Sequence, residues 1–271
     1  MAEPPSTTAE PPSSLGAPTV AVVTGAGGGI GGACALALAG SHDTVVCVDR
    51  DLDRARETVA AIEQAGGSAV PFETDAADPA FGEKVAAACT AAGKTRSAVH
   101  ALAHEEHVPA LELSLDSVRR SFTIGPLAAF ALFRALAVAP VPPPPGAAFT
   151  VIGSLHEKHA FARCLGYNAA HGALGQVVRT LAHEWAGRRI RVNAVVPGWI
   201  ATPGEVVLYG EDHLARAGRS LPFGAMGEVG QVAAAVAFLS SPAADYISGS
   251  FLTVDGALSV SLARLPEGDQ T

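Results

Sequence analysis

The chain has 271 residues, of which 49% are hydrophobic and 16% are charged, and its formal net charge is −8. This composition excludes a largely disordered chain and indicates a large buried core. The negative charge argues against a general affinity for nucleic acid or for an anionic membrane surface. The four cysteines form no CxxC pair, so we expect neither a disulfide framework nor a thiolate zinc site, and a cytoplasmic location fits.

The two ends and the most apolar helical segment set the boundaries of the folded part. Residues 1–17 are rich in Pro, Ser, Thr and Ala and lack an apolar stretch, so we expect a disordered tail and no signal peptide. The segment 127–141 contains Arg134 and runs into four prolines, which favours a buried helix over a membrane span. We expect one domain over 18–271, with the last residues from about Pro266 frayed.

Short apolar runs alternate with Ala-rich segments along the chain. We predict strands at 20–23, 44–48, 69–72, 99–103, 149–152, 191–195 and 251–254, and helices at 32–39, 52–65, 79–92, 114–138, 165–185 and 228–239. Strands that are apolar throughout are typical of parallel strands covered on both faces. The alternation therefore predicts an α/β fold: a Rossmann-like, doubly wound sheet of seven mainly parallel strands with helices on both faces.

A glycine-rich loop, TGAGGGIG at 24–31, follows the first predicted strand and opens the first helix. Glycines let the backbone approach a pyrophosphate, and the helix N-terminus supplies donors. The second strand ends near Asp49, 18 residues after Gly31, where a carboxylate can accept both ribose hydroxyls of NAD and repel a 2′-phosphate. Asp49 is alternatively an ordinary helix N-cap. Arg50 can hold a 2′-phosphate instead, so we expect NAD(H) as the preferred cofactor and keep NADP(H) open.

With these motifs the chain resembles the short-chain dehydrogenase/reductase family from about Thr19 to Gly256. The loop at 24–31 is similar to the family's TGxxxGxG, RVNAVVPG at 191–198 to its IRVNxxxPG, and DGA at 255–257 to its DGG ending. The resemblance places Asp75 at the adenine and Thr202 at the carboxamide. It implies these cofactor-binding residues: Gly25, Gly29, Ile30, Gly31, Asp49, Arg50, Asp75, Ala76, Ala103, Pro197, Gly198, Ile200 and Thr202.

A Ser and a Tyr stand at the family's catalytic spacing. Ser154 follows the predicted strand 149–152, and Tyr167 lies 13 residues later on the next predicted helix. Reduction of a carbonyl needs a hydroxyl that stabilises its oxygen and an acid that protonates it. The resemblance assigns these roles to Ser154 and Tyr167, although a strand-end Ser and a core-facing Tyr are the structural alternative. The family's Lys is His171 here, one turn beyond Tyr167. His171 could relay a proton, contact the ribose or the substrate, or have no role in the reaction.

The residues after the fourth and fifth predicted strands depart further from the family. The family's NNAG turn is aligned with HEEH at 104–107, and its catalytic Asn is missing from the next helix, so its Asn–water–Lys relay does not carry over. With HEKH at 156–159, five histidines should gather at the carboxyl edge of the sheet. We expect a polar substrate pocket with acid–base groups, or else solvated loops; the candidates are His104, Glu105, His107, His156, His159 and Trp199. No metal is predicted, because helical i, i+4 ligand spacing is absent.

Together these features predict an atypical NAD(P)-dependent oxidoreductase that moves hydride between nicotinamide and a carbonyl or alcohol carbon of a small molecule. One alternative uses the same fold for dehydration, isomerisation or cyclisation by the His/Glu residues, and another is a non-catalytic nucleotide-binding protein. The resemblance also implies a homotetramer or homodimer through helices 165–185 and 114–138. The segment 201–218 resembles the family's substrate-covering segment, and such loops vary too freely to reveal the substrate.

Overall fold

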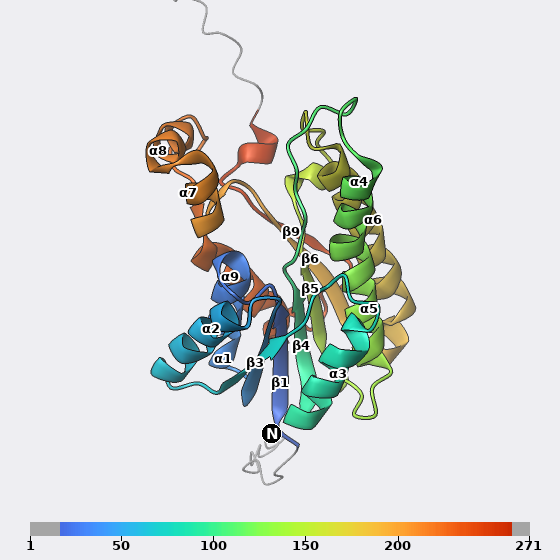
Figure 1. Cartoon of the computed structure of the whole chain (residues 1–271). Helices are drawn as coiled ribbons and strands as arrows, with labels where there is room; N and C mark the ends of the chain where they lie inside the picture. The colour runs from blue at the N-terminus through green and yellow to red at the C-terminus, as the bar shows by residue number, and fades with distance from the viewer. Residues whose placement is uncertain (1–16, 262–271) are drawn as a thin grey trace, which may run out of the picture.

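A computed structural model describes residues 17–261 of the chain. It contains a seven-stranded sheet in the order β3-β2-β1-β4-β5-β6-β9, in which every neighbouring pair is parallel. The strands are β1 (Thr19–Thr24), β2 (Thr44–Asp49), β3 (Ala69–Glu73), β4 (Lys94–His100), β5 (Ala148–Ile152), β6 (Arg191–Pro197) and β9 (Phe251–Val254). The predicted doubly wound fold is therefore confirmed (Figure 1). The predicted disordered tail, apart from Ala17, and the predicted frayed end lie outside the described residues.

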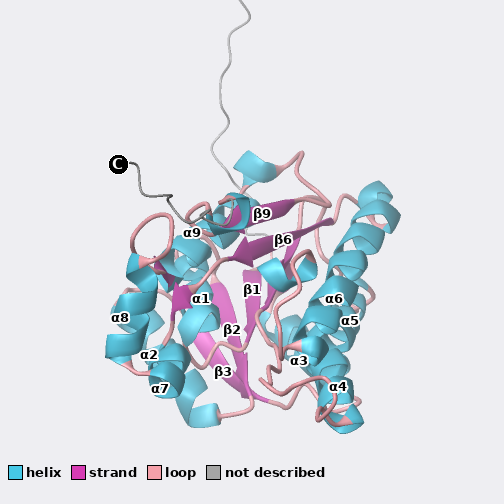
Figure 2. Cartoon of the chain, turned by 90° about the horizontal axis from the view of Figure 1, so that it is seen from above, coloured by secondary structure: helices cyan, strands magenta, loops and turns pink. Residues whose placement is uncertain are grey.

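Helices cover both faces of the sheet (Figures 1 and 2). One face is packed by α1 (Gly29–Ala39), α2 (Leu52–Gln64) and α9 (Val229–Ser240), through side chains such as Leu38 and Ile62. The other is packed by α3 (Phe81–Ala92), α5 (Ala128–Ala137) and α6 (Leu165–Glu184), with Phe133 against Phe149 of β5. Burial on both faces explains why the strands are apolar throughout.

The predicted helix at 114–138 consists of three helical segments. They are α4 (Leu115–Phe122), a π-helical turn at Thr123–Leu127, and α5. Pro126 lies in the π turn. A proline has no amide hydrogen and its ring clashes with a carbonyl of a regular helix, so a wider turn accommodates it. Among the described residues no helix is long and apolar enough to cross a bilayer, and α5 is instead buried in the domain.

Strand β4 differs from the prediction of 99–103. It begins at Lys94 and ends at His100, the residue paired with Thr24 of β1 on one side and with Val151 of β5 on the other. The glycine loop begins at Gly25, so β4 has no partner strand there beyond His100. The segment 104–107 therefore starts four residues after the strand, farther from the sheet than predicted.

The polar side chains of β6 hydrogen-bond to the segments beside it. Asn193 accepts a hydrogen bond from the Ser250 amide at 2.9 Å and donates to the Ile247 carbonyl at 2.9 Å, which ties β9 to β6. The buried Arg191 donates to the Leu239 carbonyl at 2.7 Å, at the end of α9. These bonds hold Pro197 and its neighbours at the carboxyl edge of the sheet.

Two helices at this edge escaped the sequence prediction. They are α7 (Pro203–Tyr209) and α8 (Glu211–Arg219), which lie in the chain between β7 (Ile200–Ala201) and β8 (Gly227–Glu228), two short strands that pair with each other. Thr202 caps α7, because its hydroxyl accepts from the Glu205 amide at 3.2 Å. Thr-Pro-x-Glu is a recognisable helix start that could have revealed α7. Both helices stand above the sheet on the side of α9 (Figure 1).

Candidate active site

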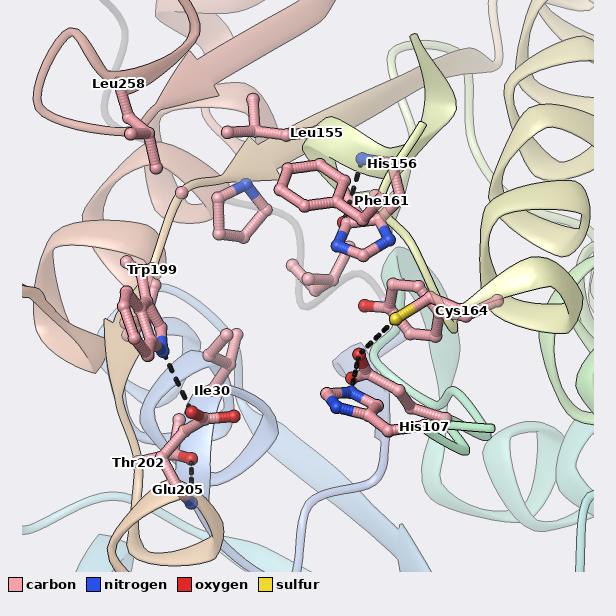
Figure 3. Close-up of a pocket in the computed structure, with 18 of the residues that line it drawn as sticks. Ile30, His107, Leu155, His156, Phe161, Cys164, Trp199, Thr202, Glu205 and Leu258 are labelled. Atoms are coloured by element: carbon pink, nitrogen blue, oxygen red, sulfur yellow. Dashed lines mark hydrogen bonds and ion pairs between the residues drawn. The ribbon is translucent and has the colours of Figure 1, made fainter. Parts of the chain in front are cut away.

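A cavity of about 470 Å³ opens at the carboxyl edge of the sheet. Figure 3 shows Ile30, Trp199, Thr202 and Glu205 on one side and His107, His156 and Cys164 on the other. The apolar lining comes mainly from Ile152, Leu155, Phe161, Pro197, Ile200 and Leu258. A cavity of this size, apolar with a few polar groups, is typical of a small-molecule site.

The glycine loop borders this cavity and has the geometry that a bound pyrophosphate needs. Gly25, Gly28 and Gly29 have φ of 73°, 138° and 55°, which side chains disfavour. A Cβ on Gly31 would overlap the Gly25 carbonyl, so only glycine lets α1 begin this close to β1. No side chain caps α1, and no acid lies in its first turn, so its amide groups remain available to an anion. The loop therefore fits the diphosphate of a dinucleotide.

Asp49 is the last residue of β2 and faces the same loop. Its carboxylate accepts from the Gly27 amide at 2.8 Å and from the Asp51 amide at 3.0 Å. The N-cap alternative for Asp49 is wrong, because Asp51 caps α2 by accepting from the amides of Asp53 and Arg54. Asp49 is still paired with Glu73 of β3, and the chain needs two more residues before the helix can begin.

Arg54 is a residue near the loop that the sequence reasoning missed. A Cβ on Gly28 would lie 3.1 Å from its guanidinium, so Arg54 reaches the loop from the first turn of α2, and Arg50 is exposed beside it. Arg54 lies in the first turn of α2, which begins at Leu52. Its direction towards the loop follows from that helix start and not from its sequence neighbours.

The other predicted cofactor residues are distributed around the cavity. Ile30, Pro197, Gly198, Ile200 and Thr202 line it. Asp75 is exposed beyond β3, where it accepts from the Ala77 amide at 2.8 Å, and Ala76 packs at the edge of the core. Ala103 lines a separate small cavity of about 10 Å³, together with Gly125 and His171.

Ser154 and Tyr167 meet in the large cavity. Ser154 follows β5 and caps a short helical turn at Leu155–Glu157. Tyr167 lies in the first turn of α6 and lines the same cavity as Ser154. Burial raises the pKa of Tyr167 above its usual value, and the charges of Glu105 and Glu205 raise it further, whereas the neighbouring Ser154 hydroxyl lowers it. The phenol is consequently protonated at neutral pH.

His171 lies against Tyr167, with ring centroids 4.2 Å apart. It is 5% exposed, and its Nδ1 has no hydrogen-bond partner in the described part of the chain. Burial lowers the pKa of His171 to about 3, so the ring is neutral at physiological pH. His171 therefore brings no positive charge to Tyr167, unlike the Lys of the resembled family.

A second buried histidine, His100, lies at the end of β4. Its Nε2 is 3.0 Å from the Ile124 carbonyl and carries the proton of that bond, so Nδ1 accepts from the Thr24 hydroxyl at 3.1 Å. Burial lowers the pKa of His100 to about 4. Sequence reasoning passed over this residue because it lies inside a strand.

These two histidines should make the fold sensitive to acid. Both folded pKa values lie below the unfolded value of 6.5, so their contribution is complete above pH 6.5 and is lost as the pH falls towards 4. At pH 5 each should lower the free energy of unfolding by about 2 kcal/mol relative to pH 7.5. Urea denaturation at both pH values checks this. His171→Gln should shrink the loss, and His183→Gln, at an exposed position of α6, should not.

The predicted gathering of five histidines is correct in part. His107 and His156 line the large cavity, and His171 lies behind Tyr167. His104 turns towards α4, where its Nε2 is 3.5 Å from the Ser117 hydroxyl, and lines only the small cavity. His159 is exposed and lines neither cavity. The segment 104–107 begins four residues after the end of β4 and not directly at the sheet edge. Glu105 and His107 therefore line the large cavity, whereas His104 lines only the small one.

His156 is held in one orientation beside Tyr167. The amide of Asn168 donates to the Phe161 carbonyl at 2.9 Å, so its oxygen faces His156 Nδ1 at 2.6 Å. Nδ1 therefore carries the ring proton, and Nε2 is left with a free lone pair. The ring stacks on Phe161 at 4.0 Å and meets Tyr167 edge-on at 4.8 Å.

Further residues of the cavity escaped the sequence prediction. Glu205 accepts from the Trp199 indole at 2.9 Å, and the Tyr209 hydroxyl is 3.3 Å from His107 Nδ1. Cys164 is buried, as the other three cysteines are, and it lines the cavity with its Sγ 4.0 Å from a Glu105 oxygen. Burial and then the Glu105 charge raise its pKa.

Comparison with known proteins agrees with this architecture. A family model described as enoyl-(acyl carrier protein) reductase matches residues 25–259. Galactitol 2-dehydrogenase (L-tagatose-forming) of Cereibacter sphaeroides is 35% identical over 247 residues, which cover 89% of this chain and 94% of the relative. Cyclohexanol dehydrogenase of an Acinetobacter strain is 34% identical over 244 residues, with 88% and 94% covered.

Solved structures give the same result. A putative NAD(P)-dependent gluconate 5-dehydrogenase from Beutenbergia cavernae, crystallised with NADP, matches with a TM-score of 0.81 and 32% identity over 93% of this chain and all of that one. A putative 2-deoxy-D-gluconate 3-dehydrogenase from Agrobacterium tumefaciens, also with NADP, matches with a TM-score of 0.80 and 31% identity over 93% of this chain and all of that one. The sheet order, the glycine loop and these matches show that the chain belongs to the short-chain dehydrogenase/reductase family of oxidoreductases.

Proposed function

We propose that this protein is an NAD(P)-dependent oxidoreductase that interconverts a carbonyl and an alcohol, with Tyr167 as the acid–base group and Ser154 as the oxygen-stabilising group. One observation carries the proposal. Ser154 and Tyr167 line the same cavity close enough for the Ser154 hydroxyl to lower the pKa of the phenol, and Ile30 of the glycine loop and Thr202 line that cavity too. A substrate oxygen at this position would meet two hydroxyl donors at once.

The chain's own residues then supply oxygen binding and proton transfer. A bound reduced nicotinamide would supply hydride to the carbonyl carbon. Ser154 donates to the carbonyl oxygen and stabilises the charge that develops there. Tyr167 gives that oxygen its phenolic proton and completes the alcohol.

We propose that His156 and not His171 returns a proton to Tyr167. His156 lines the open cavity, so its Nε2 lone pair can take a proton from water and pass that proton to the Tyr167 phenolate, whereas His171 is buried. Replacing His156 by Phe keeps the ring stacking and removes the relay, so steady-state reduction should slow about tenfold or more. Single-turnover reduction should change less, because the first proton is already on Tyr167. If steady-state and single-turnover reduction slow equally, His156 acts in the chemical step and the relay proposed here is wrong.

The names of the relatives support a proposal about the substrate class. The matched proteins are named for galactitol, cyclohexanol and gluconate. We propose a secondary alcohol and its ketone as the substrate pair. A panel of ketoses, keto sugar acids and cyclic ketones tests this with NADH and NADPH separately, followed by the absorbance of reduced nicotinamide. Oxidation of neither nucleotide across such a panel, by protein that binds them, would refute the proposed reaction.

We propose NAD(H) as the preferred cofactor, because Asp49 stands at the end of β2 beside the loop. Arg50 and Arg54 lie close by and keep NADP(H) open. Asp49→Asn removes the carboxylate charge, and a hydrogen bond to a charged group contributes roughly 1.5–3 kcal/mol. The affinity ratio of NADH to NADPH should therefore fall about 10–100-fold in calorimetric titrations. Asp53→Asn, on an exposed face of α2, should leave the ratio unchanged. An unaltered ratio in Asp49→Asn would refute this assignment.

A further inference from the structure

Three potential metal ligands of different types converge on one wall of the cavity. They are a carboxylate oxygen of Glu105, a ring nitrogen of His107 and the sulfur of Cys164, all within 4.8 Å of one another. His107 Nε2 is 2.7 Å from Glu105 Oε1, and Cys164 Sγ is 4.0 Å from that same oxygen. Figure 3 shows His107 and Cys164 on the side of the cavity opposite Trp199 and Glu205. The reaction proposed above uses none of the three.

One backbone and one side-chain hydrogen bond join the two segments that carry these ligands. Glu105 and His107 belong to the loop after β4, and Cys164 is the N-cap residue of α6. The Val108 amide donates to the Arg163 carbonyl at 2.8 Å, and the Arg163 guanidinium donates to the His107 carbonyl at 3.1 Å. Arg163 has a φ of 67°, a conformation that non-glycine residues adopt only when their surroundings hold them there. The spacing of the ligands is therefore set by the fold.

The second nitrogen of His107 is also occupied. The Tyr209 hydroxyl of α7 lies 3.3 Å from Nδ1, which leaves Nε2 directed at Glu105. Metal-binding histidines almost always have a hydrogen-bond partner on the other ring nitrogen, which fixes the ring's orientation. The arrangement around His107 has this property.

We propose that Glu105, His107 and Cys164 form a binding site for a divalent transition-metal ion of the zinc type, at the wall of the substrate cavity. Thiolate, imidazole and carboxylate together suit Zn²⁺ or Co²⁺ and do not suit Mg²⁺ or Ca²⁺, which prefer oxygen ligands. Ideal tetrahedral bond lengths place such ligand atoms about 3.4–3.6 Å apart. The nitrogen–oxygen pair must widen and the sulfur–oxygen pair must close, each by less than 1 Å.

Binding is balanced in charge and in protons. The thiol proton of Cys164 leaves to solvent. The Glu105–His107 hydrogen bond opens, and the ring proton moves through solvent from Nε2 to Nδ1, which then donates to the Tyr209 hydroxyl and leaves the Nε2 lone pair for the metal. Three metal–ligand bonds replace metal–water bonds. Thiolate and carboxylate together neutralise the two charges of the ion. Three protein ligands leave a fourth position, which faces the cavity because all three residues line it. This last step rests on the proposed function: a substrate hydroxyl or carbonyl oxygen would be the fourth ligand, which favours substrates with a second oxygen atom besides the reacting one.

Titration of the nucleotide-free full-length protein with Co²⁺ tests the site without any turnover. We expect one equivalent to bind, with a thiolate-to-cobalt charge-transfer band and d–d bands of tetrahedral intensity. Cys164→Ser should abolish the charge-transfer band, and Glu105→Gln and His107→Gln should each weaken Co²⁺ binding. Tyr209→Phe removes only the hydrogen-bond partner of a ligand and should weaken Co²⁺ binding roughly 10–100-fold. The loss of affinity in each ligand variant should be larger than this. Glu106→Gln and His183→Gln, both exposed and outside the cavity, serve as matched controls.

A second measurement on the unaltered chain covers the case of a variant that fails to fold. Zn²⁺ should slow the alkylation of Cys164 by iodoacetamide, as followed by peptide mass. Absence of the charge-transfer band together with unchanged alkylation would overturn the site and leave nicotinamide binding untouched. Binding that persists in Cys164→Ser, or that is lost equally in the controls, would overturn it too.

Discussion

Tyr167→Phe should lose carbonyl reduction almost completely while NADH binding and the fold persist. The substitution removes the phenolic hydroxyl that shares the cavity with Ser154 and leaves the ring between His156 and His171. A positioned proton donor contributes about 10²–10⁴-fold to a rate, so kcat should fall by this factor with little change in nucleotide affinity. Stopped-flow and steady-state oxidation of reduced nicotinamide measure the loss, and calorimetry measures nucleotide binding.

Two further variants sharpen this test. Ser154→Ala removes one oxygen-stabilising donor and should lower kcat by about 10²–10³-fold. Tyr246→Phe deletes a hydroxyl on a fully exposed ring and should leave kcat unchanged. If Tyr167→Phe retains more than about a tenth of the activity, the proton comes from another group and the central assignment is wrong.

Alcohol oxidation should accelerate with pH and show no plateau up to pH 10, whereas carbonyl reduction should stay flat. Oxidation needs the phenolate of Tyr167 as a base, and burial followed by the charges of Glu105 and Glu205 raises the pKa of that phenol. Below the pKa the phenolate fraction grows about tenfold per pH unit, and the oxidation rate follows it. Reduction needs the protonated phenol, which is present throughout this range. The neutral rings of His171 and His156 and the thiol of Cys164 do not reverse this direction.

His171→Lys should move that alkaline limb to lower pH. An ammonium group one turn from Tyr167 favours the phenolate, and an opposite charge at such a distance lowers a pKa by about 1–3 units. Oxidation at pH 8 should therefore rise about tenfold or more. The pH profile of kcat, taken with saturating nucleotide, checks the shift.

Matched variants separate the charge from the loss of the imidazole. His171→Gln is uncharged and should keep the original profile, and His183→Lys adds the same charge at an exposed position of the same helix and should keep it too. A folded, nucleotide-binding His171→Lys protein with an unshifted profile would show that the charge at this position does not control Tyr167.

The parts of the fold that depend on local pattern were predictable from the sequence. The glycine loop stands between a β-branched run and a helix, so both its place and its role followed from residues 24–31. The 13-residue interval from Ser154 to Tyr167 likewise implied a strand end and a helix start that meet. The order of the apolar runs predicted all seven strands of the main sheet, although β4 begins and ends earlier in the chain than predicted.

What sequence reasoning missed depends on contacts between distant segments. Cys164 meets Glu105 because the Val108 amide and the Arg163 carbonyl, and the Arg163 guanidinium and the His107 carbonyl, are hydrogen-bonded, and no local pattern reveals that pairing. The neutrality of His171 follows from burial by α4 and α6 and not from its neighbours in sequence. The end of β4 was set by the point where β1 stops. Arg54 was overlooked because its reach to the loop depends on where α2 begins.

Deuterium transfer from C4 of reduced nicotinamide tests the central claim most directly. The protein is incubated with NADH that carries deuterium at both C4 positions and with a ketone selected from the panel, and the alcohol product is examined by mass spectrometry. We expect one deuterium on the former carbonyl carbon, one equivalent of oxidised nicotinamide per alcohol, and loss of both in Tyr167→Phe. Solvent hydrogen appearing in a chemically altered substrate, with the nicotinamide left reduced, would contradict this claim and would indicate non-redox acid–base chemistry at the same site.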